Sequence, residues 1–195
     1  MEDGTLPEKP QINAFHKAST AVIGDGDTMV LPDAPASIFE GEAEMAIVIG
    51  KRAKNVSQAD AMKHIFGYIN FIDGSARGLP PQSFFHMKSR DTFAPIGPWL
   101  VTADEVPDPQ NLPMWLKVNG QTMQNGSTAT MVYGAAFLVS YLSQFFTLHP
   151  GDIISTGTPP GVGMGMKPPR YLTAGDVVEL GIEGLGSQKQ TCLQD

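Results

Sequence analysis

Glu42 and Glu44 are separated by one residue and lead into the apolar run 46–49. Side chains on a strand alternate between its two faces, so both glutamates are expected to point the same way. Two carboxylates side by side at the mouth of a buried strand repel each other, and such a pair persists where it shares a proton, faces water or binds a cation. A solvated sheet edge is the simple alternative for this pattern.

Asp73 is a third carboxylate in a similar setting, because it ends the apolar stretch 68–72. No histidine or cysteine accompanies the three carboxylates. An all-carboxylate set suits hard cations such as Mg²⁺, Mn²⁺ or Ca²⁺ and is a poor set for zinc. Glu42, Glu44 and Asp73 together therefore predict a site for a magnesium-type ion.

Four segments of the chain resemble motifs of one known family. They are EAEMAIVIG at 42–50, FGY with DGSAR within 66–77, KSRDTF with GPW within 88–99, and PGD, TGTP and GVG within 150–163. In the same order, they are similar to E-x-E-L-A-V-V-I-G, F-G-Y…D-x-S-A-R, K-S-x-D-T-F…G-P and P-G-D…T-G-T-P-x-G-V-G of the fumarylacetoacetate hydrolase family. The likeness extends from about Phe15 to Gly186.

This resemblance implies a divalent ion, Mg²⁺ or Mn²⁺ (or Ca²⁺ in a crystal), held by the two glutamates and the aspartate. Lys88 matches a lysine that donates to the oxyanion developing on the substrate, and Arg77 matches an arginine that orders the site and helps to bind the substrate. Thr158 matches a substrate-contacting threonine, and Thr92 a threonine near the metal. Three carboxylates on a divalent ion leave about one negative charge, so Lys88 and Arg77 would be needed to attract an acid.

The implied activity is hydrolytic cleavage of a carbon–carbon bond in a small 2-oxo or 2,4-dioxo acid, such as an acylpyruvate or fumarylpyruvate, through a metal-bound enolate. Such reactions belong to aromatic catabolism. Decarboxylation, isomerisation or hydration of a related oxo-acid would use the same enolate, so the metal site does not separate these activities. A catalytically silent, metal-binding family member is a third hypothesis.

The chain departs from the family pattern at two places. Pro80 stands where the family usually has a glutamine, and Gln82 is close but out of register. The family's general base belongs to a His-x-x-Glu pair in an upstream lid segment. The 195 residues begin too late to contain that pair, so the lid is expected to be absent from them.

The four histidines do not cluster at a metal-ligand spacing. His16 and His86 are candidates for neighbours of the site. His64 and His149 are expected at helix ends, where a cationic ring is favourable.

Several other residues have a plain structural interpretation. Ser75 is no hydrolase nucleophile, because its neighbours lack the G-x-S-x-G spacing. The glycines of 161–165 do not follow a strand-turn-helix pattern, so a nucleotide-binding loop is not expected. Arg77 has an alternative role as a structural ion-pair partner of Asp73 or Asp91.

Short strands and two helices are expected to position these residues. The predicted strands are 42–49, 68–73, 115–118, 153–156 and 177–182, the last taken as the final strand. Asn119-Gly120 predicts a type I′ hairpin turn. Strands and helices do not alternate regularly, so a doubly wound sheet is not expected. The resemblance and this pattern agree on an α+β, mostly β domain, a mixed β-roll or β-sandwich with a few short helices.

The first predicted helix begins at Ser57 and ends at about Phe66. The second begins near Ser127 or Thr128 and stops before Pro150, which cannot continue a helix. Its expected apolar face consists of Met131, Ala135, Leu138, Leu142 and Phe145.

The composition describes one globular domain, residues 1–195, with an extended N-terminal segment over 1–14. A net charge of −7 argues against a nucleic-acid partner. The single cysteine, Cys192, excludes a disulfide within the chain and is interpreted as an inert tail residue. Without a signal peptide or a membrane-spanning stretch, we expect a cytoplasmic protein. The low charged fraction, 17%, favours a homodimer.

Overall fold

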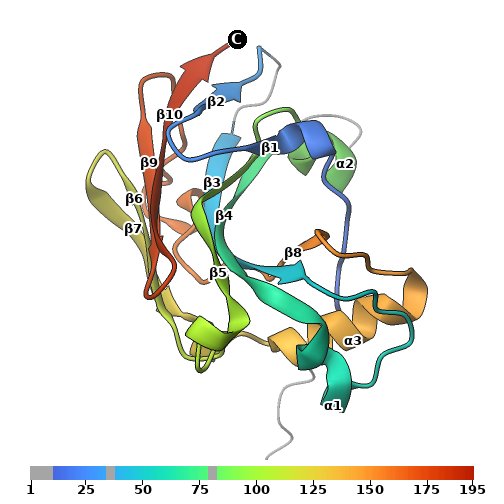
Figure 1. The fold of residues 1–195 in the computed structure, drawn as a ribbon. Coiled ribbons are helices and arrows are strands. Elements are labelled where there is room, and N and C mark those ends of the chain that lie inside the picture. Colours follow the sequence, from blue (N-terminus) through green and yellow to red (C-terminus); the bar gives the residue numbers. More distant parts are fainter. Residues whose placement is uncertain (1–10, 34–37, 79–82) are drawn as a thin grey trace, which may run out of the picture.

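The computed structural model describes residues 11–33, 38–78 and 83–195, which form two five-stranded sheets lying face to face (Figure 1). The first sheet contains, in spatial order, β1 (Val22–Ile23), β5 (Ala94–Thr102), β4 (Ile65–Arg77), β3 (Ile38–Ile49) and β8 (Ile153–Ser155). The second contains β2 (Thr28–Leu31), β10 (Gly186–Gln194), β9 (Val177–Ile182), β6 (Pro113–Val118) and β7 (Gln121–Ser127). β1 runs parallel to β5 and β2 parallel to β10, whereas the other neighbours are antiparallel. The expected mostly β fold is confirmed, and its strands form two mixed sheets.

In the described part of the chain, three short α-helices lie outside the sheets: α1 (Gln58–Ala61), α2 (Phe84–Lys88) and α3 (Ala135–Phe145). Short 3-10 turns occupy Ser19–Ala21, Met62–His64, Ala103–Glu105, Thr128–Thr130 and Gly163–Gly165. α1 and α3 pack together at one end of the sheets, and α2 lies near the other end (Figure 1). Within the described ranges, no helix is long and apolar enough to cross a membrane.

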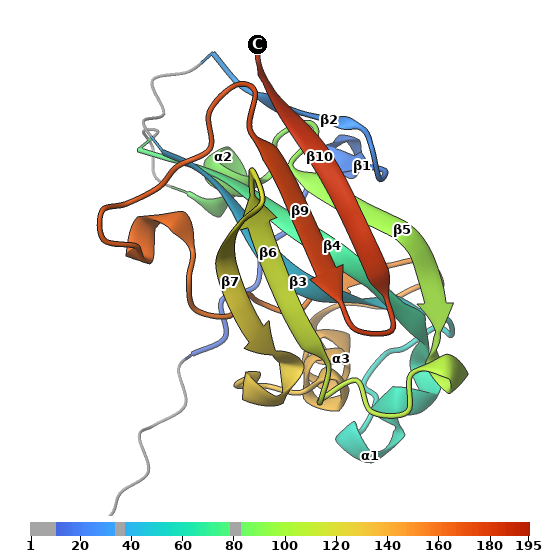
Figure 2. The ribbon, with the colours of Figure 1, turned by 90° about the vertical axis from the view of Figure 1, so that its left-hand side faces the viewer.

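The main core fills the space between the sheets, and Figure 2 shows β6, β7, β9 and β10 in front of the first sheet. Ala43, Met45 and Ile47 of β3 point into this core, where they meet Leu116 and Leu180 of the second sheet. Apolar residues occupy both faces of β3 over 45–49, and almost every position of the strand is buried. The apolar run 46–49 is therefore buried on both faces of the sheet.

The opposite face of the first sheet is divided between apolar and charged side chains. Near one end, Ala46 and Val48 of β3 pack with Ile69 and Phe71 of β4 in a second, smaller cluster. The same alternation, continued toward the other end, places the acidic positions of β3 and β4 on this face. The sheet thus carries the carboxylates on a rigid pair of strands.

Two helix predictions were wrong in extent. α1 ends at Ala61, and the chain enters β4 at Ile65 because that residue pairs with Ile49 of β3. The strand predicted at 68–73 therefore extends over Ile65–Arg77.

The second helix begins at Ala135 and not at 127 or 128, because 121–127 continue the Asn119-Gly120 hairpin as β7. Met131 precedes the helix, and the buried positions of α3 are Ala135, Val139 and Ser143. The expected face was wrong at its far end, since Phe145 is 66% exposed.

Cys192 is not a tail residue. It lies on β10, a strand that sequence reasoning missed, and is fully buried in the core. Burial raises the pKa of its thiol to about 12, so the side chain behaves as a small apolar group. Of the extended segment 1–14, residues 1–10 lie outside the described residues, and residues 11–14 form neither helix nor strand.

Candidate metal centre

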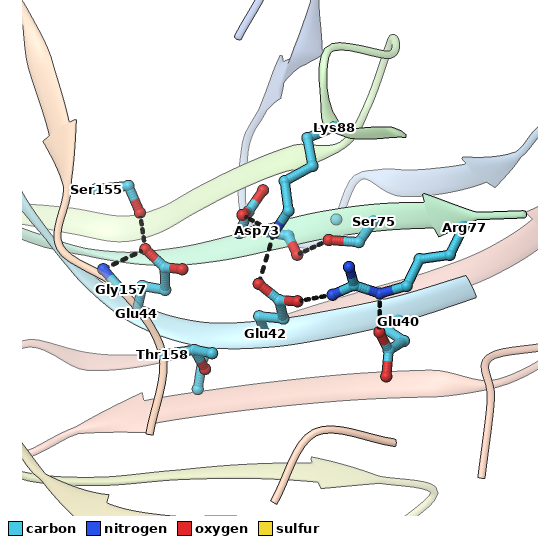
Figure 3. Close-up of polar contacts among 12 residues, drawn as sticks. Glu40, Glu42, Glu44, Asp73, Ser75, Arg77, Lys88, Ser155, Gly157 and Thr158 are labelled. Carbon is cyan, nitrogen blue, oxygen red and sulfur yellow. Dashed lines mark hydrogen bonds and ion pairs between the residues drawn. The ribbon is translucent and has the colours of Figure 1, made fainter. Parts of the chain in front are cut away.

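Strand alternation builds the floor of the site from β3 and β4. Glu42 and Glu44 lie on one face of β3, as predicted, and Asp73 lies on the same face of β4. The antiparallel register places Glu42 directly opposite Asp73. The three carboxylates, distant in sequence, therefore converge because two long strands pair without a slip along this stretch (Figure 3).

The three carboxylates fit a divalent cation. One oxygen from each of Glu42, Glu44 and Asp73 lies within 4.8 Å of the others, and all three residues are at most 5% exposed. Buried like charges at this separation are costly unless a cation compensates them. A set of carboxylate oxygens alone matches the preference of Mg²⁺ and Mn²⁺.

Glu44 shows the electrostatic strain of this arrangement most clearly. Burial and the charge of Asp73 raise the pKa of Glu44 to about 8. Two neighbours act against this shift: the Ser155 hydroxyl donates to Glu44 Oε2, and the Gly157 amide donates to the same oxygen at 2.8 Å. Sequence reasoning missed both donors, which belong to β8 and the loop after it.

Lys88 stands between two of the carboxylates. Its Nζ atom donates to Glu42 Oε2 at 2.7 Å and to Asp73 Oδ2, and the residue is 5% exposed. Burial acts to lower the pKa of Lys88, but the charges of Asp73 and Glu42 outweigh it and raise the pKa overall. The helix that carries Lys88, α2, is capped at its N-terminus by Ser83, whose hydroxyl accepts from the amide of His86.

Arg77 forms ion pairs with two glutamates of β3. Its Nε donates to Glu40 Oε2 at 2.5 Å and its Nη2 to Glu42 Oε1 at 2.6 Å (Figure 3). The predicted ion-pair partners, Asp73 and Asp91, were therefore wrong. The partner that sequence reasoning missed, Glu40, lies two residues before Glu42, and the alternation of strand faces could have found it.

Lys17 is a further basic residue that the sequence did not single out. Its Nζ donates to Asp73 Oδ1 at 2.5 Å and to the carbonyl oxygen of Gly74 at 3.3 Å. Burial lowers the pKa of Lys17, although Asp73 acts in the opposite direction. Lys17 belongs to a segment without regular structure, so no periodic pattern marked it.

The two threonines occupy different places. Thr158 lies in the loop after β8, and its Oγ1 accepts from Gln124 Nε2 at 2.8 Å. Thr92 has a left-handed backbone conformation (φ 66°), and its Oγ1 accepts from the amide of Val30 at 2.8 Å. In the structure, Thr92 thus joins the turn before β5 to strand β2.

Three further residues considered from the sequence, His16, Ser75 and His86, have contacts in the structure. His86 lies on α2 with Lys88, and its Nδ1 is 3.0 Å from the Ser83 hydroxyl. The ring of His16 packs against that of Phe146, with 5.6 Å between the centroids. Pro80 and Gln82 lie outside the described residues. Ser75 follows Asp73 on the same face of β4 and donates to its carbonyl oxygen at 3.4 Å.

Comparison with known proteins supports a single family. The family profile described as fumarylacetoacetate (FAA) hydrolase C-terminal matches residues 2–192. The chain is 47% identical over 189 residues to the 2,4-didehydro-3-deoxy-L-rhamnonate hydrolase of a Sphingomonas species, and the match covers 95% of this chain and 65% of that protein. The chain spans about 66% of the length of the other curated relatives that it matches.

Solved structures agree with the sequence match. Maleylpyruvate hydrolase from Sphingobium sp. SYK-6, in complex with manganese(II) and pyruvate, superposes with a TM-score of 0.84 at 37% identity, over 92% of this chain and 64% of that one. 5-Carboxymethyl-2-hydroxymuconate delta-isomerase from Mycobacterium smegmatis superposes with a TM-score of 0.87 at 36% identity, over 100% of this chain and 73% of that one. On the profile, the relatives and the shared fold, this chain belongs to the fumarylacetoacetate hydrolase family.

Proposed function

We propose that the protein is a Mg²⁺- or Mn²⁺-dependent enzyme that hydrolyses a carbon–carbon bond in a small 2-oxo or 2,4-dioxo acid of the acylpyruvate type. The observation that carries this proposal is the buried convergence of Glu42, Glu44 and Asp73 within 4.8 Å of one another. These three residues would be the ligands of the ion. When bound, the ion would polarise the substrate's carbonyl and stabilise the negative charge that develops on its oxygen.

The charges around the ligands favour an acidic substrate. Four carboxylates, those of Glu40, Glu42, Glu44 and Asp73, lie among three basic side chains, those of Lys17, Arg77 and Lys88. The ionised side chains carry one more negative than positive charge, and a divalent cation would make the cluster net positive. An anionic substrate would then be attracted to a site in an otherwise acidic protein.

The chain's own side chains have distinct roles in the proposed reaction. Lys88, protonated and held beside Glu42 and Asp73, would donate to the oxygen on which charge develops. Arg77 would orient Glu42, and Thr158 would contact the substrate from the loop after β8. Thr92, in the turn that follows α2, would lie close to the ion.

The bond changes balance with water as the second reactant. Water adds to the carbonyl on the far side of the bond, and that bond breaks to give a carboxylic acid. The electron pair of the broken bond remains on the pyruvate half as an enolate, which takes up a proton to give pyruvate. The solved relative that contains manganese(II) and pyruvate supports this choice of ion and product.

A second candidate is isomerisation of a related oxo-acid, favoured by the similar fold of the delta-isomerase from Mycobacterium smegmatis. Decarboxylation or hydration would use the same cluster of carboxylates. A metal-binding protein without turnover is the third alternative. These hypotheses differ in their products and not in their ligands.

The experiment is to incubate the purified protein with acylpyruvates and Mn²⁺ and to identify the products by NMR. Pyruvate and a second carboxylic acid indicate hydrolysis, carbon dioxide indicates decarboxylation, and a rearranged double bond indicates isomerisation. Glu42→Gln should abolish turnover. Undiminished turnover in this variant would refute the role of the carboxylate cluster, and an inactive wild-type protein that binds Mn²⁺ would favour the silent alternative.

We also expect a cytoplasmic homodimer, as the family resemblance and composition imply. Large exposed apolar side chains, including Phe85 (68%), Trp99 (58%) and Phe145 (66%), are consistent with a buried interface. Light scattering coupled to size-exclusion chromatography tests the dimer directly.

A further inference from the structure

The segment after β8, residues 156–172, follows β3 closely, and we refer to it as the site loop. Four backbone amides of the site loop donate to atoms of four β3 residues. These hydrogen bonds join Thr156 N to Met45 O (3.1 Å), Gly157 N to Glu44 Oε2 (2.8 Å), Met164 N to Glu40 Oε1 (2.6 Å) and Leu172 N to Phe39 O (2.8 Å). Two of the four acceptors are carboxylates, so the loop depends on charged side chains of the same strand that carries the candidate ligands.

Glu40 of β3 accepts a hydrogen bond from the middle of the site loop, and its side chain is 0% exposed. One oxygen accepts from Met164 N at 2.6 Å, and the other accepts from Arg77 Nε at 2.5 Å. A buried carboxylate is costly unless it is paired and hydrogen-bonded. Both oxygens of Glu40 thus accept hydrogen bonds from residues around the site.

Arg77 transmits the effect of Glu40 to a candidate metal ligand. Its guanidinium lies between two glutamates, with Nε on Glu40 and Nη2 on Glu42 at 2.6 Å. The negative charge of Glu40 offsets that of the guanidinium, which reduces the repulsion between Arg77 and a cation bound at Glu42. Without Glu40, the whole positive charge of Arg77 would oppose a cation at Glu42.

We propose that Glu40 is a positioning residue with two tasks. Its charge balances Arg77, so that Glu42 keeps its affinity for a divalent cation, and its second oxygen fastens the middle of the site loop. The first task rests on the proposed metal site, whereas the second does not. The loop carries Thr158, the residue that we expect to contact the substrate, so one buried carboxylate would couple both halves of the site.

The test compares three changes at this position with a matched control. Glu40→Gln removes the charge at nearly constant volume, and Glu40→Asp keeps the charge but shortens the reach. The double variant Glu40→Gln/Arg77→Met removes both members of the ion pair. Glu179→Gln is the control, because it removes one carboxylate of a remote ion pair with Lys189 on the second sheet. Mn²⁺ binding is measured by electron paramagnetic resonance, and loop order by hydrogen exchange of the amides between 160 and 170.

Glu40→Gln should weaken Mn²⁺ binding roughly tenfold, the lower end of the effect expected for a partner of a metal ligand. Glu40→Asp should retain wild-type Mn²⁺ affinity, yet exchange at Met164 should become about tenfold faster as its acceptor withdraws. The double variant should bind Mn²⁺ more tightly than Glu40→Gln alone, because the unbalanced charge of Arg77 is gone. A purely structural role predicts instead that the double variant is the weakest binder.

Three results would overturn the proposal. They are wild-type Mn²⁺ affinity in Glu40→Gln, a further loss of affinity in the double variant, and unchanged exchange at Met164 in Glu40→Asp. If Glu40→Gln does not fold, Glu40→Asp and the double variant still test both tasks. If the wild-type protein itself binds no Mn²⁺, the proposed function fails, and exchange at Met164 then decides the loop task separately.

Discussion

Glu42 and Asp73 lie directly opposite each other on the antiparallel strands β3 and β4. Like charges in this position destabilise a sheet, and both residues are buried. The protein compensates with the ammonium group of Lys88, which contacts both carboxylates. The pairing register of the sheet is therefore also the feature that assembles the candidate metal centre.

Addition of Mn²⁺ to metal-depleted protein should raise its melting temperature. A ligand present at 100 times its Kd stabilises the native state by about 2.7 kcal/mol. For a chain of this size, that corresponds to a shift of roughly 5–10 °C. Differential scanning calorimetry, with EDTA as the reference, measures the effect.

The variant Glu44→Gln tests whether Glu44 is a ligand in the same melting experiment with Mn²⁺. It removes one ligand charge at a position where the carboxylate is under the strain that raises its pKa to about 8. The metal-free variant should be at least as stable as the metal-free wild type, but its melting temperature should respond much less to Mn²⁺. An equal response in both proteins would count against Glu44 as a ligand.

Lys88→Met should lower kcat by about 100-fold, the scale expected for losing one donor to a developing oxyanion. Mn²⁺ affinity should not fall, because the change removes a positive charge beside the ligands. Steady-state kinetics and Mn²⁺ titration separate these two effects.

Lys63→Met is the control for Lys88, because Lys63 forms an exposed ion pair with Asp60. It should leave both kcat and Mn²⁺ affinity at their wild-type values. A parallel loss of activity and metal binding in Lys88→Met would indicate that Lys88 only supports the fold.

Gly67→Ala should destabilise the protein by about 1–3 kcal/mol, as overpacking does. An added Cβ at Gly67 would overlap with the carbonyl oxygen of Val101 on β5, the strand that pairs with β4. Gly165→Ala is the control, since its Cβ would meet its nearest neighbour, Val162, at 4.0 Å. Urea unfolding compares the two, and equal stabilities would show that β4 and β5 separate easily.

Asp176 should make stability depend on pH in a defined direction. Burial alone would raise the pKa of Asp176, but hydrogen bonds from Arg170, Thr173 and Asn119 outweigh it and lower the pKa below 3.8. A depressed pKa in the folded state contributes stability that is present above the unfolded pKa. This contribution is lost as the pH falls through the folded value.

Asp176→Asn should therefore cost about 1.5–3 kcal/mol at pH 7, the range for hydrogen bonds to a charged group. The difference from wild type should shrink as the pH falls below the unfolded pKa, because the carboxylate of the unfolded chain takes up a proton before that of the folded chain does. Urea unfolding at pH 7, 5 and 3 measures it. A difference that stays constant over this range would show that the charge of Asp176 does not contribute.

Local patterns in the sequence predicted those features that depend on neighbouring residues. The alternation of strand faces placed Glu42 and Glu44 together, and the Asn119-Gly120 turn and strand 177–182 were confirmed. β10 was missed because its buried positions include Gln188 and Gln190, which do not form an apolar alternation. A search based on alternating hydrophobicity does not detect a strand whose core-facing residues are polar.

By itself, the sequence determined the family, the fold class and the acidic trio, since these follow from motifs and from the two-residue repeat of a strand. Tertiary structure alone decided the partners of that trio. Lys17 reaches Asp73 across 56 residues, and the Gly157 amide reaches Glu44 across 113. Such contacts depend on strand register and loop path, and these are set by packing of the whole chain and not by local propensity. The candidate ligands could therefore be predicted from the sequence, whereas the contacts of Lys17, Ser155 and Gly157 with them depend on the folded structure.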